Sequence, residues 1–100
     1  MDLTIIIPVK NEENNILNIV DSINSKIKVD YEILFIDDFS TDNTKNVVKK
    51  FSSKKKFVKI FSNKKKGLGS AISLGILKST NKYLAIFMAD MSDDPKDLLN

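Results

Sequence analysis

The sequence predicts an α/β fold, a Rossmann-like parallel sheet with alternating helices. Residues 33–36 and 83–88 are apolar without polar alternation, which is typical of strands that a parallel sheet buries on both faces. Stretches with apolar residues at helical spacing lie between the strand segments, and the connections are short. Because strand and helix alternate along the whole chain, we expect parallel strands joined by right-handed crossovers.

Length and composition narrow the class of protein. A chain of 100 residues can form one compact α/β domain but not two. It contains no cysteine and no histidine, which excludes disulfides, thiolate metal sites and imidazole catalysis. The first apolar run, residues 5–7, is far too short for a signal peptide or a membrane span, so we expect a soluble protein.

The first strand and helix are predicted at the start of the chain. Residues 4–9 form a β-branched strand with Pro8 near its end, where a missing amide hydrogen can be tolerated. Glu12 and Glu13 give the following helix a negative first turn. The helix is recognised by an apolar stripe at i, i+3, i+4, i+7 and i+11, formed by Ile16, Ile19, Val20, Ile23 and Ile27.

The second strand ends abruptly in carboxylates. Asp37 and Asp38 follow the apolar run 33–36, at the strand end where open α/β sheets place their ligands. Turn and helix-cap residues come next, and then apolar residues at helical spacing: Ser40, Thr41 and Asp42, followed by Val47, Val48 and Phe51. An ordinary strand-to-helix connection is the alternative, with Asp42 capping the helix and the other two acids merely solvated.

Two further strands complete the pattern. Residues 56–61 should form the third strand, and residues 63–69 its exit loop. A helix at about 70–78 should pack through Leu68, Ala71, Ile72, Gly75 and Ile76. Residues 83–88 are wholly apolar and should form a central strand, which delivers Asp90, Asp93 and Asp94 to the carboxyl edge before Pro95 opens a fourth helix. We expect the 100 residues to be part of a larger fold.

Charge is separated along the sequence. The net charge is +3, yet twelve lysines and no acid occur between Asp42 and Asp90. This pattern indicates a basic face for phosphate, nucleic acid or an anionic membrane, or else a solvated surface without a partner. Every basic residue is lysine, and the lack of arginine disfavours nucleic acid.

The carboxylates predict a site for a hard cation and phosphates. The clusters Asp37/Asp38 and Asp90/Asp93/Asp94 should meet at one edge, and oxygen ligands of this kind suit Mg²⁺ or Mn²⁺ together with a phosphorylated substrate. The lysine and glycine loop 64–69 could approach the phosphates. A dinucleotide fingerprint is excluded because the first strand-to-helix turn, residues 9–12, has no glycine.

Four segments, 5–14, 32–44, 63–75 and 88–95, resemble successive signatures of family 2 glycosyltransferases. They are most similar to the branch of dolichyl-phosphate mannose synthases and bacterial polyprenyl-phosphate sugar transferases. The resemblance implies a GT-A fold, of which residues 1–100 would be the nucleotide-sugar-binding half without the acceptor half. It also implies transfer of a sugar from a UDP- or GDP-sugar to a polyprenyl or dolichyl phosphate, in the cytoplasm at the inner face of the membrane.

The resemblance also assigns site residues. Those expected to bind the nucleotide-sugar are Pro8, Lys10, Glu12, Ile36, Asp37, Asp38, Gly67, Ala89 and Asp90. Asp38 would accept hydrogen bonds from the base, and Asp90, with Ser92 and Asp93, would hold Mg²⁺ or Mn²⁺. The chain departs from the family pattern at Met88, which stands for the first aspartate of Asp-x-Asp, and at Phe39, which stands for a glycine.

Two other classes remain as alternatives. A phosphoacceptor receiver-like signalling domain also has an Asp-Asp pair after an apolar strand, but that pair should end its first strand. A basic binding module would use the lysine-rich middle of the chain and show steep salt dependence without base preference. We also expect the last strand to offer an exposed apolar edge, through which two copies could form a homodimer.

Overall fold

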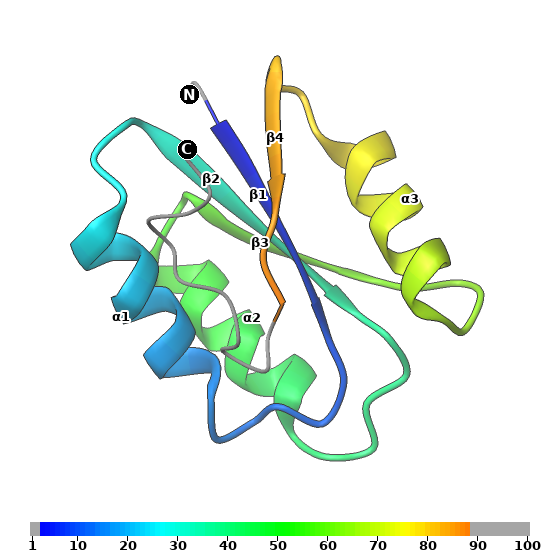
Figure 1. Cartoon of the computed structure of the whole chain (residues 1–100). Coiled ribbons are helices and arrows are strands. Elements are labelled where there is room, and N and C mark those ends of the chain that lie inside the picture. Colours follow the sequence, from blue (N-terminus) through cyan, green and yellow to red (C-terminus); the bar gives the residue numbers. More distant parts are fainter. Residues whose placement is uncertain (1–2, 89–100) are drawn as a thin grey trace.

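The computed structural model describes residues 3–88, and these form one parallel sheet with three helices (Figure 1). In chain order the elements are β1 (Leu3–Val9), α1 (Ile16–Lys26), β2 (Tyr31–Asp37), α2 (Thr44–Lys54), β3 (Val58–Ser62), α3 (Leu68–Lys78) and β4 (Tyr83–Ile86). The strand order is β3-β2-β1-β4, and every pair is parallel. The predicted Rossmann-like α/β fold is confirmed. Pro95 and the fourth helix predicted there lie outside the described residues.

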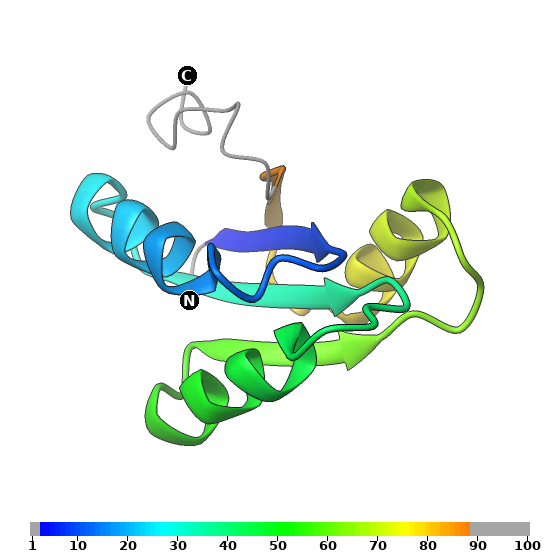
Figure 2. The ribbon, with the colours of Figure 1, turned by 90° about the horizontal axis from the view of Figure 1, so that it is seen from below.

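The helices divide between the two faces of the sheet (Figure 2). On one face, α1 and α2 cover the alternate side chains of β1 and β2 that include Ile5, Ile7 and Phe35. On the other face, α3 packs over Ile6 and Ile36. The predicted apolar stripe of α1 is confirmed, because Ile16, Ile19, Val20 and Ile23 are all buried in the first core. No helix among residues 3–88 has the length and apolar character needed to cross a bilayer.

The packing stripe predicted for α3 was too wide. Ala71 and Gly75 are buried as expected, but Leu68 and Ile76 are 48% and 49% exposed. The reason is a close approach of helix and sheet, in which a Cβ atom added at Gly75 would lie 2.4 Å from Ile6 Cγ2. Ala71 and Gly75 are therefore buried in the contact and Leu74 packs against it, while Leu68 and Ile76 remain about half exposed.

We expect Gly75→Ala to lower the free energy of unfolding by about 1–3 kcal/mol, because the added Cβ would overlap the side chain of Ile6, which is fully buried. Gly69→Ala is the matched control within the same helix, since a Cβ there meets nothing within 4 Å. It should raise stability by up to about 1 kcal/mol through helix propensity. Chemical denaturation of the two variants checks this, and equal effects would contradict the close approach.

The expected exposed edge at the fourth strand is present among residues 3–88, and a central position of this strand in a larger sheet stays a prediction. β4 pairs with β1 and lies at the edge of the sheet. Tyr83, Leu84 and Ile86 are 61%, 42% and 39% exposed, and only Phe87, just after the strand, is fully buried. An apolar sequence predicts a strand, but it does not reveal whether neighbouring elements cover both of its faces. Homodimer formation through this edge remains a prediction.

Candidate functional site

The loops that follow β1 and β2 are joined by hydrogen bonds centred on Asn11. Its backbone amide donates to Ser40 Oγ at 2.9 Å. Its side-chain Oδ1 accepts from the backbone amides of Thr41, at 2.8 Å, and Asp42, at 3.3 Å. The Glu12 amide donates to Thr44 Oγ1 at 2.8 Å. Asn11 has a φ of 54°, a conformation that asparagine tolerates better than most residues. The two loops therefore form one fixed rim at the carboxyl edge of the sheet.

Asp42 accepts three hydrogen bonds that hold this rim. Its Oδ1 accepts from the amide and the hydroxyl of Thr44, and its Oδ2 accepts from the Glu13 amide at 3.3 Å. Desolvation favours the neutral acid, but these hydrogen bonds outweigh it and lower the pKa of the Asp42 carboxyl from its ordinary value. Asp42 therefore binds the first residue of α2, but the N-cap position that the alternative gave to Asp42 belongs to Asn43.

The lowered pKa predicts a direction for the pH dependence. A carboxyl whose pKa is lower in the folded than in the unfolded chain stabilises the fold above its unfolded pKa, and this contribution disappears as the pH falls through the folded pKa. We expect the Asp42 carboxyl to titrate below its ordinary value of 3.8 in a carbon-detected NMR titration. Titration of Asp42 at or above 3.8 would contradict the hydrogen-bonded arrangement.

Asp37 and Asp38 are neighbours in sequence but differ in environment. Asp37 is only 5% exposed, and its Oδ2 accepts from the Ser40 amide at 3.4 Å. Within residues 3–88, no hydrogen bond reaches its buried Oδ1. The alternative that both acids are merely solvated is therefore wrong for Asp37. Its side chain is buried and accepts a hydrogen bond from the loop that forms the rim.

Asp38 is held by the loop that follows β3. Its Oδ1 accepts from Asn63 Nδ2 at 3.0 Å and from the Gly67 amide at 3.1 Å. Asn63 Nδ2 also donates to the Gly67 carbonyl at 3.2 Å, and its own backbone amide donates to the Asp37 carbonyl at 2.8 Å. No donor within residues 3–88 is found for the second carboxylate oxygen of Asp38, which is half-exposed. Within this part of the chain, one oxygen of the carboxylate is anchored and the other has no hydrogen-bond partner.

Asp38 lines a cleft of about 190 Å³. The cleft is lined by Pro8, Val9, Lys10, Glu12, Asp38, Leu68 and Met88. The structure therefore brings together four of the predicted site residues, and Gly67 reaches them through its hydrogen bond to Asp38. Ile36 and Asp37 are buried and do not line it. The predicted residues Ala89, Asp90, Ser92 and Asp93 lie outside the described residues.

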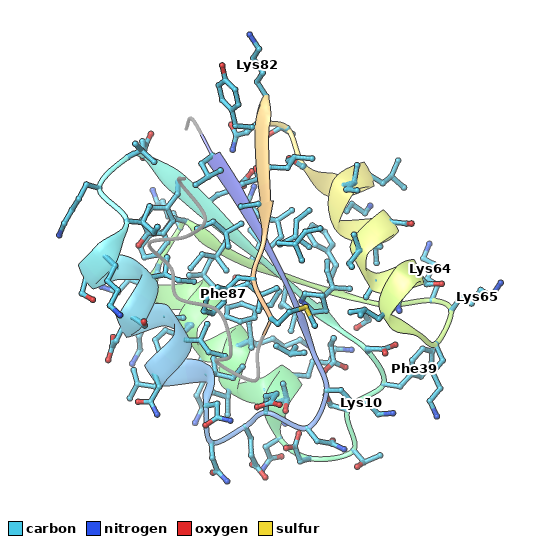
Figure 3. The ribbon with its side chains drawn as sticks, in the orientation of Figure 1. Lys10, Phe39, Lys64, Lys65, Lys82 and Phe87 are labelled. Atoms are coloured by element: carbon cyan, nitrogen blue, oxygen red, sulfur yellow. The ribbon has the colours of Figure 1, made fainter. Side chains whose placement is uncertain are left out.

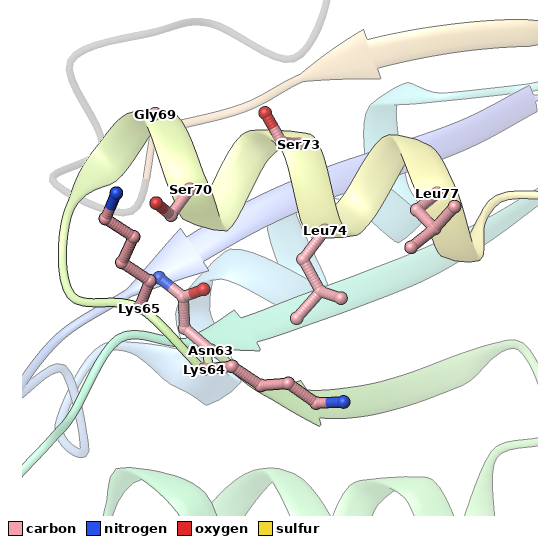
Figure 4. A pocket seen from close by; sticks show the side chains of 8 residues that line it. All are labelled: Asn63, Lys64, Lys65, Gly69, Ser70, Ser73, Leu74 and Leu77. Atoms are coloured by element: carbon pink, nitrogen blue, oxygen red, sulfur yellow. The ribbon is translucent and has the colours of Figure 1, made fainter.

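A second and more open hollow, of about 500 Å³, adjoins the same loop (Figure 4). It is lined by Asn63, Lys64, Lys65, Gly69, Ser70, Ser73, Leu74 and Leu77. The lysines come from the β3–α3 loop, and the other residues come mainly from α3. Asn63 is the site residue that the sequence analysis missed. Its only signal in the sequence is an amide side chain directly ahead of the lysine and glycine loop.

The described residues contain no metal-binding cluster. Between residues 3 and 88, no group of three or more acidic side chains is arranged so that it could hold a metal ion. Met88 lines the cleft, but its thioether is a poor ligand for a hard cation. The predicted ligands Asp90, Ser92 and Asp93 have the hard oxygen donors that Mg²⁺ and Mn²⁺ prefer, and they follow Met88 by two to five residues.

Solved structures share this fold. TarS from S. aureus in complex with UDP matches with a TM-score of 0.78 and 22% identity, over 90% of this chain and 28% of that chain. A mannosyltransferase from Pyrobaculum calidifontis in complex with GDP-Man and Mn²⁺ matches with a TM-score of 0.74 and 22% identity, over 88% of this chain and 27% of that chain. The architecture is therefore that of GT-A glycosyltransferases.

Sequence comparison identifies the family. A dolichol-phosphate mannosyltransferase from Pyrococcus furiosus is 31% identical over 97 residues, which cover 96% of this chain and 28% of the relative. A dolichyl-phosphate beta-glucosyltransferase from Dictyostelium discoideum is 34% identical, over 95% of this chain and 32% of the relative. The chain thus spans about a third or less of the length of these relatives. The model of glycosyl transferase family 2 matches residues 4–100, and the chain belongs to this family.

Proposed function

We propose that residues 1–100 form the donor-binding part of a glycosyltransferase and bind the nucleotide of a UDP- or GDP-sugar in the cleft at Asp38. The arrangement of this carboxylate carries the proposal. Asn63 and Gly67 hold one of its oxygens, while the other is available to accept a hydrogen bond from an N–H group of the base. A charged acceptor with a fixed position is well suited to recognise a neutral base.

The surrounding residues suit the other parts of a nucleotide. Pro8, Lys10 and Glu12 line the same cleft and would lie near the nucleoside. Lys64 and Lys65 flank the start of α3, where free backbone amides and the helix dipole favour an anion such as a diphosphate. Ile36 and Asp37 are buried and would not contact the nucleotide. They would fix the carboxyl end of β2, which Asp38 directly follows.

A divalent cation completes the proposal. Asp90, with Ser92 and Asp93, would hold Mg²⁺ or Mn²⁺ against the diphosphate, and Ala89 would lie beside them. When bound, the cation would neutralise the charge that develops on the departing nucleoside diphosphate. The solved structure of the mannosyltransferase from Pyrobaculum calidifontis, which shares the fold, is a complex with GDP-Man and Mn²⁺.

We propose a polyprenyl or dolichyl phosphate as the acceptor, at the inner face of the cytoplasmic membrane. Two relatives that are more than 30% identical to the chain are named dolichol-phosphate or dolichyl-phosphate sugar transferases. Because the chain spans a third or less of these relatives, it should bind the donor better than it catalyses transfer.

Calorimetric titration of the chain with UDP and GDP, with and without Mg²⁺, tests donor binding. We expect one base to be preferred and Mg²⁺ to tighten binding. The test also separates the alternatives. Steep salt dependence without base preference would indicate the basic binding module, and phosphorylation of Asp90 by acetyl phosphate would indicate the receiver-like domain.

A further inference from the structure

Phe39, the residue directly after Asp38, has a backbone conformation that its side chain disfavours. Its φ is 60°, in the left-handed region that suits glycine and that a bulky residue adopts only at a cost. Its side chain is 47% exposed, so burial in a core does not compensate this cost. An observed outlier of this kind, directly after Asp38, which lines the cleft, points to a function for the side chain.

Neighbouring hydrogen bonds hold Phe39 in this conformation from both sides. Before it, the Asp38 amide donates to the Val9 carbonyl at 2.8 Å. After it, the Ser40 amide donates to Asp37 Oδ2, and Ser40 Oγ accepts from the Asn11 amide. The hydrogen-bonded rim therefore fixes the backbone turn at Phe39, and with it the point on the loop from which the ring extends.

The ring lies at the edge of the sheet that carries the candidate site. Lys10 follows β1, Phe39 follows β2 and Lys64 follows β3, and in a parallel sheet these strand ends share one edge. Figure 3 shows Phe39 at this edge together with Lys10, Lys64 and Lys65. The lysines suit anionic groups, whereas an exposed ring offers a flat apolar face.

We propose that Phe39 stacks against the base of the bound nucleotide while the adjacent Asp38 accepts a hydrogen bond from the edge of that base. This inference rests on the proposed function and adds a residue to its site. A nucleobase suits both Phe39 and Asp38, because it combines a planar face that can stack with N–H donors at its edge. Phe39 is thus a base-positioning residue that takes the place of a glycine.

The proposal predicts opposite changes in stability and in binding. Phe39→Gly and Phe39→Asn relieve the disfavoured conformation, and we expect each to raise the Tm by roughly 4 °C. Both remove the ring, and we expect them to weaken binding of UDP or GDP about tenfold, the usual effect of losing a stacked aromatic residue. Phe39→Tyr keeps the ring and should bind within about twofold of the unchanged chain, by the same reasoning.

Calorimetry and thermal unfolding of the chain and these three variants test the proposal, with inorganic pyrophosphate and Mg²⁺ as the base-free probe. We expect pyrophosphate to bind all four proteins equally. Unchanged UDP and GDP affinity in Phe39→Gly would overturn the stacking role. So would an equal loss of pyrophosphate binding, because the effect would then come from the shape of the loop. Failure of the unchanged chain to bind any nucleotide would overturn the proposed function itself, and stacking with it.

Discussion

Asp38→Asn is expected to weaken nucleotide binding about 10- to 100-fold without unfolding the chain. The carboxamide oxygen can still accept from Asn63 and Gly67, so the β3–α3 loop keeps its anchor. The amide nitrogen then faces the cleft, where it can donate but cannot accept a hydrogen bond from the base. Loss of a hydrogen bond to a charged group costs about 1.5–3 kcal/mol, which corresponds to the expected range.

Asp21→Asn is the matched control for Asp38→Asn. It makes the same chemical change at an exposed position of α1, away from the cleft. Its affinity should equal that of the unchanged chain. If Asp38→Asn bound UDP and GDP as tightly as Asp21→Asn, then Asp38 would not be the acceptor for the base.

Glu32→Ala is expected to cause the largest loss of stability, about 3 kcal/mol. Glu32 lies in β2 and is 2% exposed, and its Oε2 accepts from Thr4 Oγ1 at 2.9 Å and from Asn81 Nδ2 at 3.0 Å. Lys59 Nζ lies 3.5 Å from Oε1. These contacts join β1, β2, β3 and the residues before β4. Removal of the Glu32 carboxylate leaves the buried Thr4 hydroxyl and the Asn81 side-chain amide without their charged acceptor.

Thermal unfolding measures this loss. About 3 kcal/mol corresponds to a decrease in Tm of at least roughly 12 °C for a domain of this size. Lys59→Gln is the control, and because the Lys59 side chain is 52% exposed, its loss should cost less than about 1 kcal/mol. A change in Tm below 3 °C for Glu32→Ala would show that the network contributes little, on the same scale of a few degrees per kcal/mol.

Periodic patterns predicted most of the fold. The stripe of α1 and the unbroken apolar runs of β1 and β2 identify buried faces directly, because each depends on spacing within a single element. The position of Asp38 at the carboxyl edge follows from the same reasoning, since parallel strands end together. Glu32 shows where this reasoning stops. It lies in a strand recognised by its apolar residues, and its burial depends on partners from three other segments.

The details that shape the site depend on contacts between distant segments. Asn11 and Thr41 are 30 residues apart, and Asp38 and Asn63 are 25 residues apart. No pattern within a single helix or strand therefore predicts either contact. The turn at Phe39 is likewise imposed by hydrogen bonds from neighbouring loops, and the residue type alone would predict a different backbone. In α3, the close approach at Gly75 decides which apolar residues are buried.

An amide NMR titration with UDP, GDP and their sugar conjugates in the presence of Mg²⁺ tests the central claim most directly. We predict shifts for one base that are localised to residues 8–12, 38–40 and 63–68, and their loss in Asp38→Asn. A dispersed spectrum of the folded chain with no shifts for any nucleotide would contradict donor binding by this chain.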